Sequence, residues 1–264
     1  GVRLVGSEMC IRDSYMIGSD SGLFFFSRKN GRWSVSGDNL AEESIYRCFR
    51  DREGGIWIGT YFCGVNYLSP RQDEILWYYD DGRPESLDGN AVSQFCDDGR
   101  GNLWIATENG GLNHFDVRNR KFTNHTARSH NNLHALCMDG DDLLIGTFSQ
   151  GLDLMNLRTG KVVNYRNIPG DSASLCNDYV YAIFRASDGT LYVGTMSGMC
   201  TFDKRRGRFS RVKITEGRFI YDIAEDTGGN IWVASKVSGI YRYSPGDGAW
   251  KNYRHDELDP RSPA

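Results

Sequence analysis

The sequence is poor in several features that would point to particular classes of protein. Its 264 residues include only six prolines, and no apolar run approaches the roughly 20 residues that a membrane-spanning helix needs. The first residues lack the order of basic, apolar and small residues that marks a signal peptide. Lys and Arg are scattered among Asp and Glu, with a net charge of −3, so no basic stripe indicates a nucleic-acid partner. Abundant glycine with little proline is instead typical of many tight turns between short strands.

The cysteines do not form a pattern that would crosslink the chain or bind zinc. There are seven, an odd number, and none is arranged as C-x-x-C, which argues against a disulfide framework and a zinc site. The seven are Cys10, Cys48, Cys63, Cys96, Cys137, Cys176 and Cys200. Three of them, Cys48, Cys96 and Cys137, lie in equivalent regions with apolar neighbours, where we expect small buried side chains. Taken alone, this cysteine usage favours a reducing compartment.

Signatures of catalysis are absent as well. The sequence has no H-E-x-x-H, Walker loop, G-x-S-x-G elbow or dinucleotide fingerprint. His125, His130 and His134 are loosely spaced in a predicted loop, so a solvated turn is a better interpretation than a metal site. The acidic cluster at 139–142 resembles part of a calcium-binding loop but lacks the later glutamate, and we interpret it as turn acids. We therefore expect no catalytic residue, no metal site and no cofactor in this chain.

What the sequence does contain is a repeat with a period of roughly forty residues. One copy, Asp98 to Asp116, reads D-x-x-G-N-L-W-I-A-T-x-x-G-G-L-x-x-F-D, and five other segments repeat it with variations. The large residue at its centre recurs as Met16, Trp57, Trp104, Leu144, Tyr192 and Trp232. Three positions later a hydroxyl recurs as Ser19, Thr60, Thr107, Thr147, Thr195 and Ser235. A glycine then recurs as Gly22, Gly64, Gly111, Gly151, Gly198 and Gly239. Six copies in one register indicate an array of small sheets.

Each copy divides into four short strands separated by turn-forming segments. The strands of the third copy are expected at 92–96, 103–107, 111–115 and 122–125. A single four-stranded sheet with apolar residues on both faces cannot bury them, whereas copies stacked around an axis bury both faces. The sequence therefore predicts an all-β fold, a β-propeller of four-stranded antiparallel blades. The large side chains would fill the space between blades, and the Gly or Ala two positions later would let the next sheet approach.

The repeat predicts five complete blades and most of a sixth, which we interpret as part of a seven-bladed ring. Residues 15–264 would form the propeller, incomplete at both ends, because the first copy has no recognisable first strand. Residues 1–14 do not fit the repeat. We interpret them as a foreign leader, such as a cloning or assembly scar, with a divergent first strand as the alternative.

The unit at Asp98 to Asp116 resembles the two-component regulator propeller repeat. Asp51 to Leu68 and Asp226 to Tyr243 resemble it nearly as well, and the resemblance covers about residues 15–253. It implies the periplasmic sensor region of hybrid two-component sensor histidine kinases of the Bacteroidetes type, which often detect oligosaccharides and regulate polysaccharide-utilisation genes. Such a parent implies neighbouring propeller and signalling domains, a homodimer, and a membrane contact made outside this chain. The chain itself shows no kinase, receiver or helix-turn-helix pattern.

Positions where the copies differ mark a candidate ligand-binding surface. The loop after the constant hydroxyl varies most, and aromatic faces beside carboxylates and amides suit a sugar ring. The candidate residues are Arg47, Tyr61, Phe62, Glu108, Asn109, His134, Phe148, Gln150 and Lys236. Arg47 and His134 are aligned with Gln94 and Asp222 at one position of the first strands, which could line a central channel. The alternative is that the aromatic side chains cap neighbouring blades.

Residues that recur from blade to blade are assigned to structure rather than to a site. They are Trp57, Thr60, Gly64, Asp98, Trp104, Thr107, Gly111, Thr147, Gly151, Tyr192, Thr195, Trp232 and Gly239. Three functions follow from this division: a non-catalytic propeller that senses an oligosaccharide, a protein-interaction or dimerisation scaffold, and a propeller glycosidase or lyase. The third requires a cluster of acid, base or metal-binding residues, which the sequence does not supply.

Overall fold

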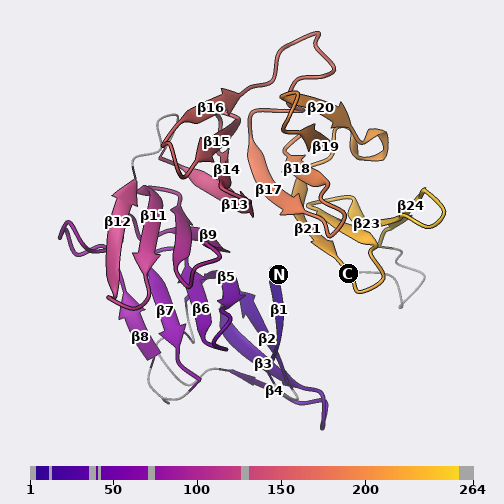
Figure 1. Cartoon of the computed structure of the whole chain (residues 1–264). Coiled ribbons are helices and arrows are strands. Elements are labelled where there is room, and N and C mark those ends of the chain that lie inside the picture. Colours follow the sequence, from indigo (N-terminus) through magenta and orange to yellow (C-terminus); the bar gives the residue numbers. More distant parts are fainter. Residues whose placement is uncertain are drawn as a thin grey trace. The chain divides into compact units, whose positions relative to one another are not determined.

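The computed structural model describes residues 4–11, 14–35, 40, 43–70, 75–125 and 131–255, with side chains described from residue 15 onward. The chain divides into two compact units, Gly1–Leu133 and His134–Ala264, with three four-stranded sheets in each (Figure 1). The only helical element among the described residues is a short 3-10 helix, η1 (Lys213–Thr215). No helix in the described part of the chain is long and apolar enough to cross a membrane.

In the first unit the strands of each sheet follow sequence order and pair antiparallel. The first sheet comprises β1 (Leu4–Ile11), β2 (Ser14–Ser19), β3 (Gly22–Ser27) and β4 (Trp33–Val35). The second comprises β5 (Ile45–Arg50), β6 (Ile56–Thr60), β7 (Val65–Leu68) and β8 (Ile75–Tyr78). The third comprises β9 (Val92–Asp97), β10 (Leu103–Thr107), β11 (Gly111–Asp116) and β12 (Lys121–His125).

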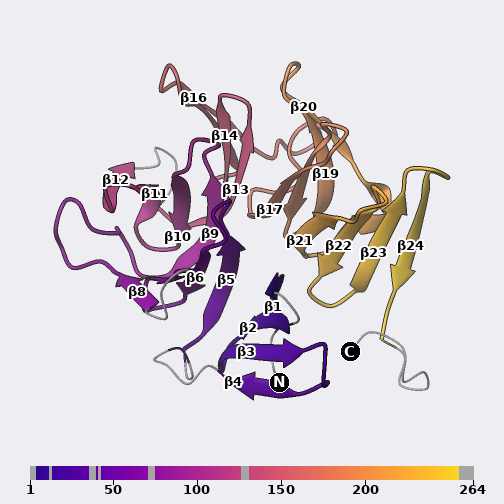
Figure 2. The same cartoon turned by 60° about the horizontal axis from the view of Figure 1, so that its bottom comes forward.

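The second unit repeats this arrangement. Its first sheet comprises β13 (Leu133–Asp139), β14 (Asp142–Thr147), β15 (Leu152–Asn156) and β16 (Val162–Tyr165). Its second comprises β17 (Val180–Arg185), β18 (Leu191–Thr195), β19 (Gly198–Asp203) and β20 (Arg208–Arg211). Its third comprises β21 (Ile220–Glu225), β22 (Ile231–Ser235), β23 (Gly239–Ser244) and β24 (Ala249–Tyr253). β14 contacts β17 and β17 contacts β21, so consecutive sheets pack through their first two strands (Figure 2).

The first sheet differs from the prediction. We expected five complete blades and most of a sixth, but residues 4–11 form β1 and complete a sixth four-stranded sheet. β1 pairs with β2 on both sides of an irregularity between Val5 and Met9. Backbone pairing does not require the side-chain repeat, which is why the sequence did not reveal this strand. The foreign origin of residues 1–14 and the seven-bladed parent ring remain predictions.

In five of the six sheets the constant hydroxyl closes the turn between the second and third strands, whereas the Ser235 hydroxyl of the last sheet has no hydrogen-bond partner among the described residues. Thr147 Oγ1 donates a hydrogen bond to the Gly151 carbonyl at 2.9 Å and accepts one from the backbone N–H of Gln150 at 2.8 Å. The same donation joins Thr60 to Gly64, Thr107 to Gly111 and Thr195 to Gly198. Gly151 has a φ of 79°, and a Cβ there would lie 2.1 Å from the carbonyl oxygen of Tyr165. The turn therefore requires both the hydroxyl and the glycine.

Small residues in the second strands let consecutive sheets approach within each unit. A Cβ at Gly59 would lie 2.7 Å from Val92 of the next sheet. The large residue two positions earlier fills the adjoining space, since Trp57 is 1% exposed and meets Phe115 edge-on with ring centres 5.4 Å apart. The packing expected from the sequence is confirmed here, and this dense apolar contact is what holds neighbouring sheets together.

The cysteines expected to be buried differ in their burial. Cys48 is buried, whereas Cys96 and Cys137 are half-buried. Cys48 pairs with Ile58 in the middle of β6, whereas Cys96 lies one residue nearer to the turn and pairs with Trp104. Burial raises the pKa of the Cys137 thiol to about 11, with a further contribution from the nearby Asp139 carboxylate. In the part of the chain whose side chains are described, the six cysteines form no disulfide bond with one another.

Four first strands carry a β-bulge near their beginning, and in three of them the extra residue is a tyrosine. β17 shifts register between Val180 and Ala182, which leaves Tyr181 as the extra residue. β5 and β21 shift in the same way around Tyr46 and Tyr221. A bulge re-aims the side chain of its extra residue, so these tyrosines leave the normal alternation of the sheet. They form part of the surface described next.

Candidate functional site

Aromatic side chains from three consecutive sheets of the second unit form a continuous row. This unit 2 row consists of His134, Phe148, Tyr179, Tyr181, Phe219 and Tyr221. The His134 ring centre lies 5.6 Å from that of Phe148 and 4.7 Å from that of Tyr181. Tyr181 lies 4.5 Å from Phe219 and stacks on Tyr221 at 6.5 Å. Rings in such a series provide an extended surface of apolar faces and polar edges.

Phe148 and Tyr179 form one end of the row. Phe148 follows the constant hydroxyl in the β14–β15 turn, and Tyr179 directly precedes β17. The two rings meet edge to face with centres 5.2 Å apart. Phe148 nevertheless remains 37% exposed, so part of its ring is available to a ligand.

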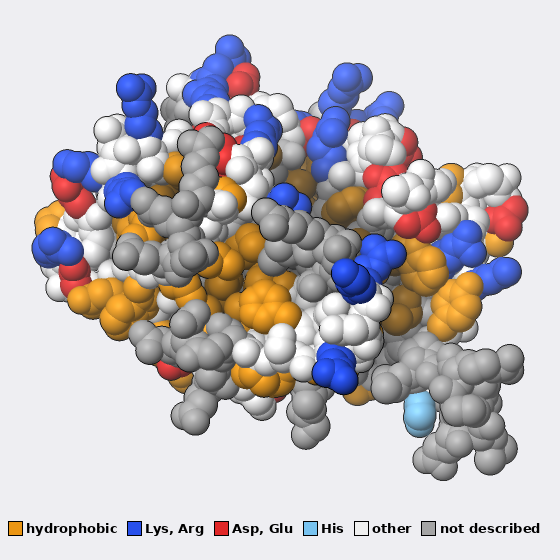
Figure 3. Space-filling model, turned by 90° about the horizontal axis from the view of Figure 1, so that it is seen from below, with side chains coloured by type: hydrophobic (Ala, Val, Ile, Leu, Met, Phe, Trp, Pro, Cys, Tyr) orange, Lys and Arg blue, Asp and Glu red, His pale blue; other side chains and the backbone are white. Residues whose placement is uncertain are grey.

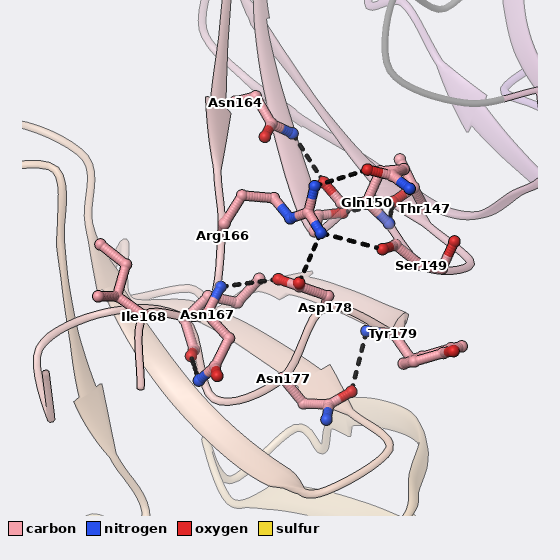
Figure 4. A network of polar contacts seen from close by, with 12 residues as sticks. Thr147, Ser149, Gln150, Asn164, Arg166, Asn167, Ile168, Asn177, Asp178 and Tyr179 are labelled. Carbon is pink, nitrogen blue, oxygen red and sulfur yellow. Dashed lines mark hydrogen bonds and ion pairs between the residues drawn. The ribbon is translucent and has the colours of Figure 1, made fainter. Parts of the chain in front are cut away.

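A polar network holds the two loops that carry these rings (Figure 4). Arg166 donates from Nη1 to Oε1 of Gln150 at 2.6 Å and from Nη2 to Oδ2 of Asp178 at 2.7 Å. The hydrogen bond to Asp178 raises the pKa of Arg166, so the guanidinium stays charged. Gln150 lies two residues after Phe148, and Asp178 directly precedes Tyr179. The network therefore fixes the distance between the two loops and orients their rings.

Lys236 lies at the other end of the row. Its ammonium is 5.4 Å from the ring centre of Phe219, a cation–π contact, and its backbone N–H donates to the Phe219 carbonyl at 3.1 Å. Asp222 follows Tyr221 in β21, where it is half-buried and accepts a hydrogen bond from the Ile223 N–H at 2.9 Å. The row thus runs from an exposed phenylalanine to the ammonium of Lys236.

The first unit carries a shorter aromatic cluster at the corresponding place. This unit 1 cluster consists of Tyr46, Tyr61 and Phe62. The bulge residue Tyr46 stacks on Tyr61, with centres 5.1 Å apart and planes at 16°. Tyr61 meets Phe62 edge to face at 4.2 Å, and Phe62 is 72% exposed. Arg47, which is half-buried on β5, is the neighbour of Tyr46 in the chain.

Three of the predicted site residues take part in loop structure instead of the aromatic surfaces. Glu108 donates its backbone N–H to the Ala91 carbonyl at 2.8 Å, and Asn109 Oδ1 accepts from the Ala91 N–H at 3.3 Å. The side chain of Gln150 binds Arg166 in the network described above. These contacts hold the variable turns against the segments that precede the next sheets.

His134 does not occupy the position expected from the sequence. We aligned it with Arg47, which pairs with Gly59 in the second strand of its sheet. A Cβ at Gly146 would lie 3.0 Å from Ala135, so Ala135 takes the place opposite the small residue. His134 is therefore one residue earlier, at the place of the bulge tyrosines. The turn between β13, which ends at Asp139, and β14, which begins at Asp142, is shorter than the turn between β5 and β6, so an alignment that counts residues back from the small residue was wrong by one position.

Sequence reasoning missed five aromatic members of the two surfaces. These are Tyr46, Tyr179, Tyr181, Phe219 and Tyr221. A signal for four of them exists in the segments Tyr-Val-Tyr at 179–181 and Phe-Ile-Tyr at 219–221, which place aromatic rings on both sides of a buried aliphatic residue. Alternation of this kind in a first strand indicates an aromatic face opposite the core.

The described residues present contact surfaces more than reactive groups. Among them, no group of three or more His, Cys, Asp or Glu side chains is placed to hold a metal ion. His125 packs against Trp104 with ring centres 5.1 Å apart, and His134 packs within the unit 2 row. His130, the third histidine of the predicted loop, lies outside the described residues.

Comparison with known proteins matches parts of the chain to one family. The model of the family described as two component regulator propeller matches residues 39–62, 86–109 and 174–197. A curated relative, Histidine kinase P4 of Formosa agariphila, is 31% identical over 81 residues, which cover 27% of this chain and 6% of the kinase. The chain therefore spans only a small part of the length of this relative.

Solved structures share the fold. A crystal structure described as the extracellular domain of a hybrid two component system from B. thetaiotaomicron has a TM-score of 0.82 and 18% identity, covering 95% of this chain and 34% of that one. Virginiamycin B lyase from Staphylococcus aureus has a TM-score of 0.73 and 11% identity, covering 98% of this chain and 89% of that one. At these identities the likeness establishes the fold, an all-β propeller with four-stranded antiparallel blades. With the family match, the chain is a propeller that contains three segments similar to two-component regulator propeller repeats.

Proposed function

We propose that the chain is the ligand-sensing propeller of a membrane-bound hybrid two-component sensor histidine kinase and that its ligand is an oligosaccharide. In this proposal the propeller is periplasmic and non-catalytic. It acts through neighbouring propeller and signalling domains of a homodimeric parent to regulate polysaccharide-utilisation genes. The family match and the similarity to an extracellular domain of a hybrid system support the sensor assignment.

The unit 2 row supports a carbohydrate ligand. Sugar rings present C–H groups that pack on aromatic faces, and their hydroxyls bind charged and amide groups at the edge of such a surface. The row offers ring faces in series, with Lys236 at one end. The single observation that carries the proposal is the partly exposed ring of Phe148. The charged network of Arg166 holds the loops around this ring, and the ring is not buried in the core.

Signalling requires that the ligand prefer one state of the parent over another. A ligand shifts an equilibrium only by the difference between its affinities for the two states. The loops that carry Phe148 and Tyr179 belong to different sheets, so a ligand that contacts both would favour one relative placement of those sheets. The network of Arg166 would transmit this preference to the adjoining strands.

Glycan-array binding followed by calorimetry tests this function. Saturable binding of an oligosaccharide is expected, and Phe148→Ala and Tyr61→Ala should weaken it by about tenfold or more, which corresponds to about 1.4 kcal/mol. Val163→Ala is the matched control, because Val163 is also 37% exposed but lies on β16, outside both aromatic surfaces. Absence of binding to any glycan, or equal weakening by all three substitutions, would overturn the proposal.

Two other functions have an observation in their favour. Exposed apolar side chains, among them Trp33 at 60% and Trp77 at 54%, favour a protein-interaction or dimerisation scaffold, and Figure 3 shows hydrophobic side chains gathered on one face. The likeness to virginiamycin B lyase over nearly the whole chain favours a propeller lyase. Saturable glycan binding by the monomeric chain argues against the scaffold, and turnover of a bound glycan by the pure chain would establish an enzyme.

A further inference from the structure

A cavity in the first unit lies away from the unit 1 cluster. Its volume is about 260 Å³, and its walls include the rings of Trp57, Tyr67, Tyr78 and Phe115. The Trp57 ring centre is 4.3 Å from that of Tyr67, and the Tyr78 ring centre is 5.0 Å from that of Phe115. The cavity is bordered by Glu53 of the β5–β6 turn, by Ser69 and Pro70 after β7, and by Val117 and Arg120 of the β11–β12 turn, at the opposite strand ends from the turn that holds Tyr61. It is therefore separate from the surface assigned to the oligosaccharide.

Two opposite charges border this cavity. Glu53 comes from the β5–β6 turn and Arg120 from the β11–β12 turn, so each charge is supplied by a different sheet. Both side chains are exposed, and neither forms an ion pair with another residue in the described part of the chain. Burial raises the pKa of Tyr67, and the carboxylates of Asp51 and Glu53 raise it further while Arg120 lowers it. The ring of Tyr67 is thus within the field of both charges.

The second unit fills the corresponding place with its own side chain. Lys204 stands two residues after Phe202, as Val117 stands two residues after Phe115. The Lys204 ammonium contacts Asp142 Oδ2 at 2.9 Å and the Asp139 carbonyl at 3.1 Å. The Lys204 side chain therefore fills the space between the two sheets. Burial lowers the pKa of Lys204, but the hydrogen bonds to Asp139 and Asp142 outweigh this effect and raise the pKa overall.

The first unit has no such side chain at this place. Val117 replaces the lysine, and Gly55, which directly precedes β6, replaces Asp142, the first residue of β14. The hydroxyl of Tyr67 lies only 2.3 Å from where a Cβ of Gly55 would be, so the glycine makes room for the tyrosine ring. The two units therefore differ at this place. In the second unit the ion pairs of Lys204 close it, and in the first unit it is an open cavity lined by aromatic rings.

We propose that this cavity binds a zwitterionic α-amino acid with a large apolar side chain. The apolar side chain would pack against Tyr67, Tyr78 and Val117. The α-ammonium would face Glu53, and the α-carboxylate would face Arg120. Aromatic walls with a few charged groups at the edge are typical of sites for small molecules, and this volume admits a single compact ligand.

Calorimetric titration of the complete chain with L-phenylalanine tests the proposal. The expected result is saturable binding in which L-phenylalanine amide, without the carboxylate, and 3-phenylpropionate, without the ammonium, each bind at least about tenfold more weakly, because each loses one charge-assisted contact. Glu53→Gln and Arg120→Gln should each weaken L-phenylalanine to a similar degree. Val117→Lys should abolish binding, because it copies the side chain that closes the second unit. Arg118→Gln is the matched control, an exposed arginine of the same turn that does not line the cavity.

The outcomes separate this site from the proposed oligosaccharide surface. Phe148→Ala should leave L-phenylalanine binding unchanged, and Arg120→Gln should leave glycan binding unchanged. If Val117→Lys does not fold, the two charge substitutions decide alone, since both residues are exposed. The proposal is overturned if binding of L-phenylalanine does not saturate at about 10 mM. That concentration is on the order of a hundredfold above the dissociation constant of a typical specific site. Equal binding of the amide and of L-phenylalanine overturns the proposal as well.

Discussion

The indole nitrogen of Trp57 donates a hydrogen bond of 2.9 Å to Oδ2 of Asp51. The other carboxylate oxygen accepts from the backbone N–H groups of Glu53 and Gly55, at 3.0 and 2.7 Å. One aspartate therefore joins the turn between the first two strands to the large buried ring between two sheets. The same bond links the tryptophan and the turn aspartate of the last sheet at 2.8 Å.

The third sheet departs from this arrangement. Oδ2 of Asp98 lies 3.1 Å from Nε2 of His114 and accepts a hydrogen bond from the side chain of Asn102, also at 3.1 Å. The indole nitrogen of Trp104 is buried without a hydrogen-bond partner among the described residues. The histidine has thus taken the acceptor that the tryptophan uses in the second and last sheets.

Removing Asp51 should destabilise the first unit. Asp51→Ala leaves the indole N–H of the buried Trp57 without an acceptor and opens the turn, so the free energy of unfolding should fall by about 1–3 kcal/mol. Urea denaturation followed by tryptophan fluorescence measures this change. Asp188→Ala is the control, because Asp188 accepts the Thr190 N–H at 2.8 Å in an exposed turn but binds no indole. Equal losses in the two variants would show that the indole bond contributes nothing.

Truncation of a large ring between sheets should have a greater effect. Trp104 is 6% exposed, so Trp104→Ala should lower the free energy of unfolding by about 3–5 kcal/mol through lost burial and the cavity left behind. Trp77→Ala removes the same side chain from a position that is 54% exposed, and it should cost much less. Chemical denaturation of both variants under one set of conditions makes the comparison. A Trp104→Ala loss no larger than that of Trp77→Ala would contradict burial between sheets.

Stability should depend on the protonation of His125. Burial lowers the pKa of His125, with a smaller contribution from His114, so the folded state favours the neutral ring. The stabilising contribution is complete above the unfolded pKa of about 6.5 and is lost as the pH falls from there through the folded pKa. The unfolding midpoint in urea should therefore fall between pH 7.5 and 5.5, and His125→Phe should reduce that fall. His255→Gln, at an exposed histidine, should leave the pH dependence of the wild-type chain unchanged.

The close approach of consecutive sheets predicts a coupling between two residues. A Cβ at Gly194 would lie 2.7 Å from Cγ2 of Ile220, so Gly194→Ala should destabilise the second unit by about 1–3 kcal/mol. Ile220→Ala should relieve the clash, so the double variant should be more stable than the sum of the single changes predicts. Gly246→Ala, at a glycine with open space around it, controls for the change in backbone entropy. Strict additivity of the two substitutions would contradict a direct contact.

The fold could be predicted wherever a buried side chain imposed its own pattern. Trp57 and Gly59 recur at fixed spacing because a large ring and a thin neighbour must meet between sheets. β1 could not be predicted, because backbone pairing holds it without the side-chain repeat. His134 was placed one residue out of register because the turn between β13 and β14 is shorter than the turn between β5 and β6. The candidate surface was located by its variable turns, including Phe148, but its continuity through Tyr181 depends on the β17 bulge, which has no signature of its own in the sequence.

The network around Arg166 should matter more for ligand binding than for stability. Arg166 pairs with Asp178 at 2.7 Å, but the arginine side chain is 42% exposed, and exposed pairs stabilise proteins by only about 0–1 kcal/mol. Arg166→Gln should therefore leave the unfolding midpoint nearly unchanged. Because the pair orients the loops of Phe148 and Tyr179, the same substitution should weaken oligosaccharide binding by about tenfold, as a loss of preorganisation.

Calorimetry with the glycan selected on the array measures that effect. Arg206→Gln is the matched control, since it removes another surface ion pair of 2.7 Å, to Asp203, on the distant β19–β20 hairpin. Arg166→Lys separates charge from geometry, because a lysine keeps the cation but cannot bind Gln150 and Asp178 from two nitrogens at once. Weakening by Arg166→Gln and Arg166→Lys, but not by Arg206→Gln, would identify the forked contact as the feature that presents Phe148 to the ligand. Equal affinity in all three variants would leave that ring positioned by its aromatic neighbours alone.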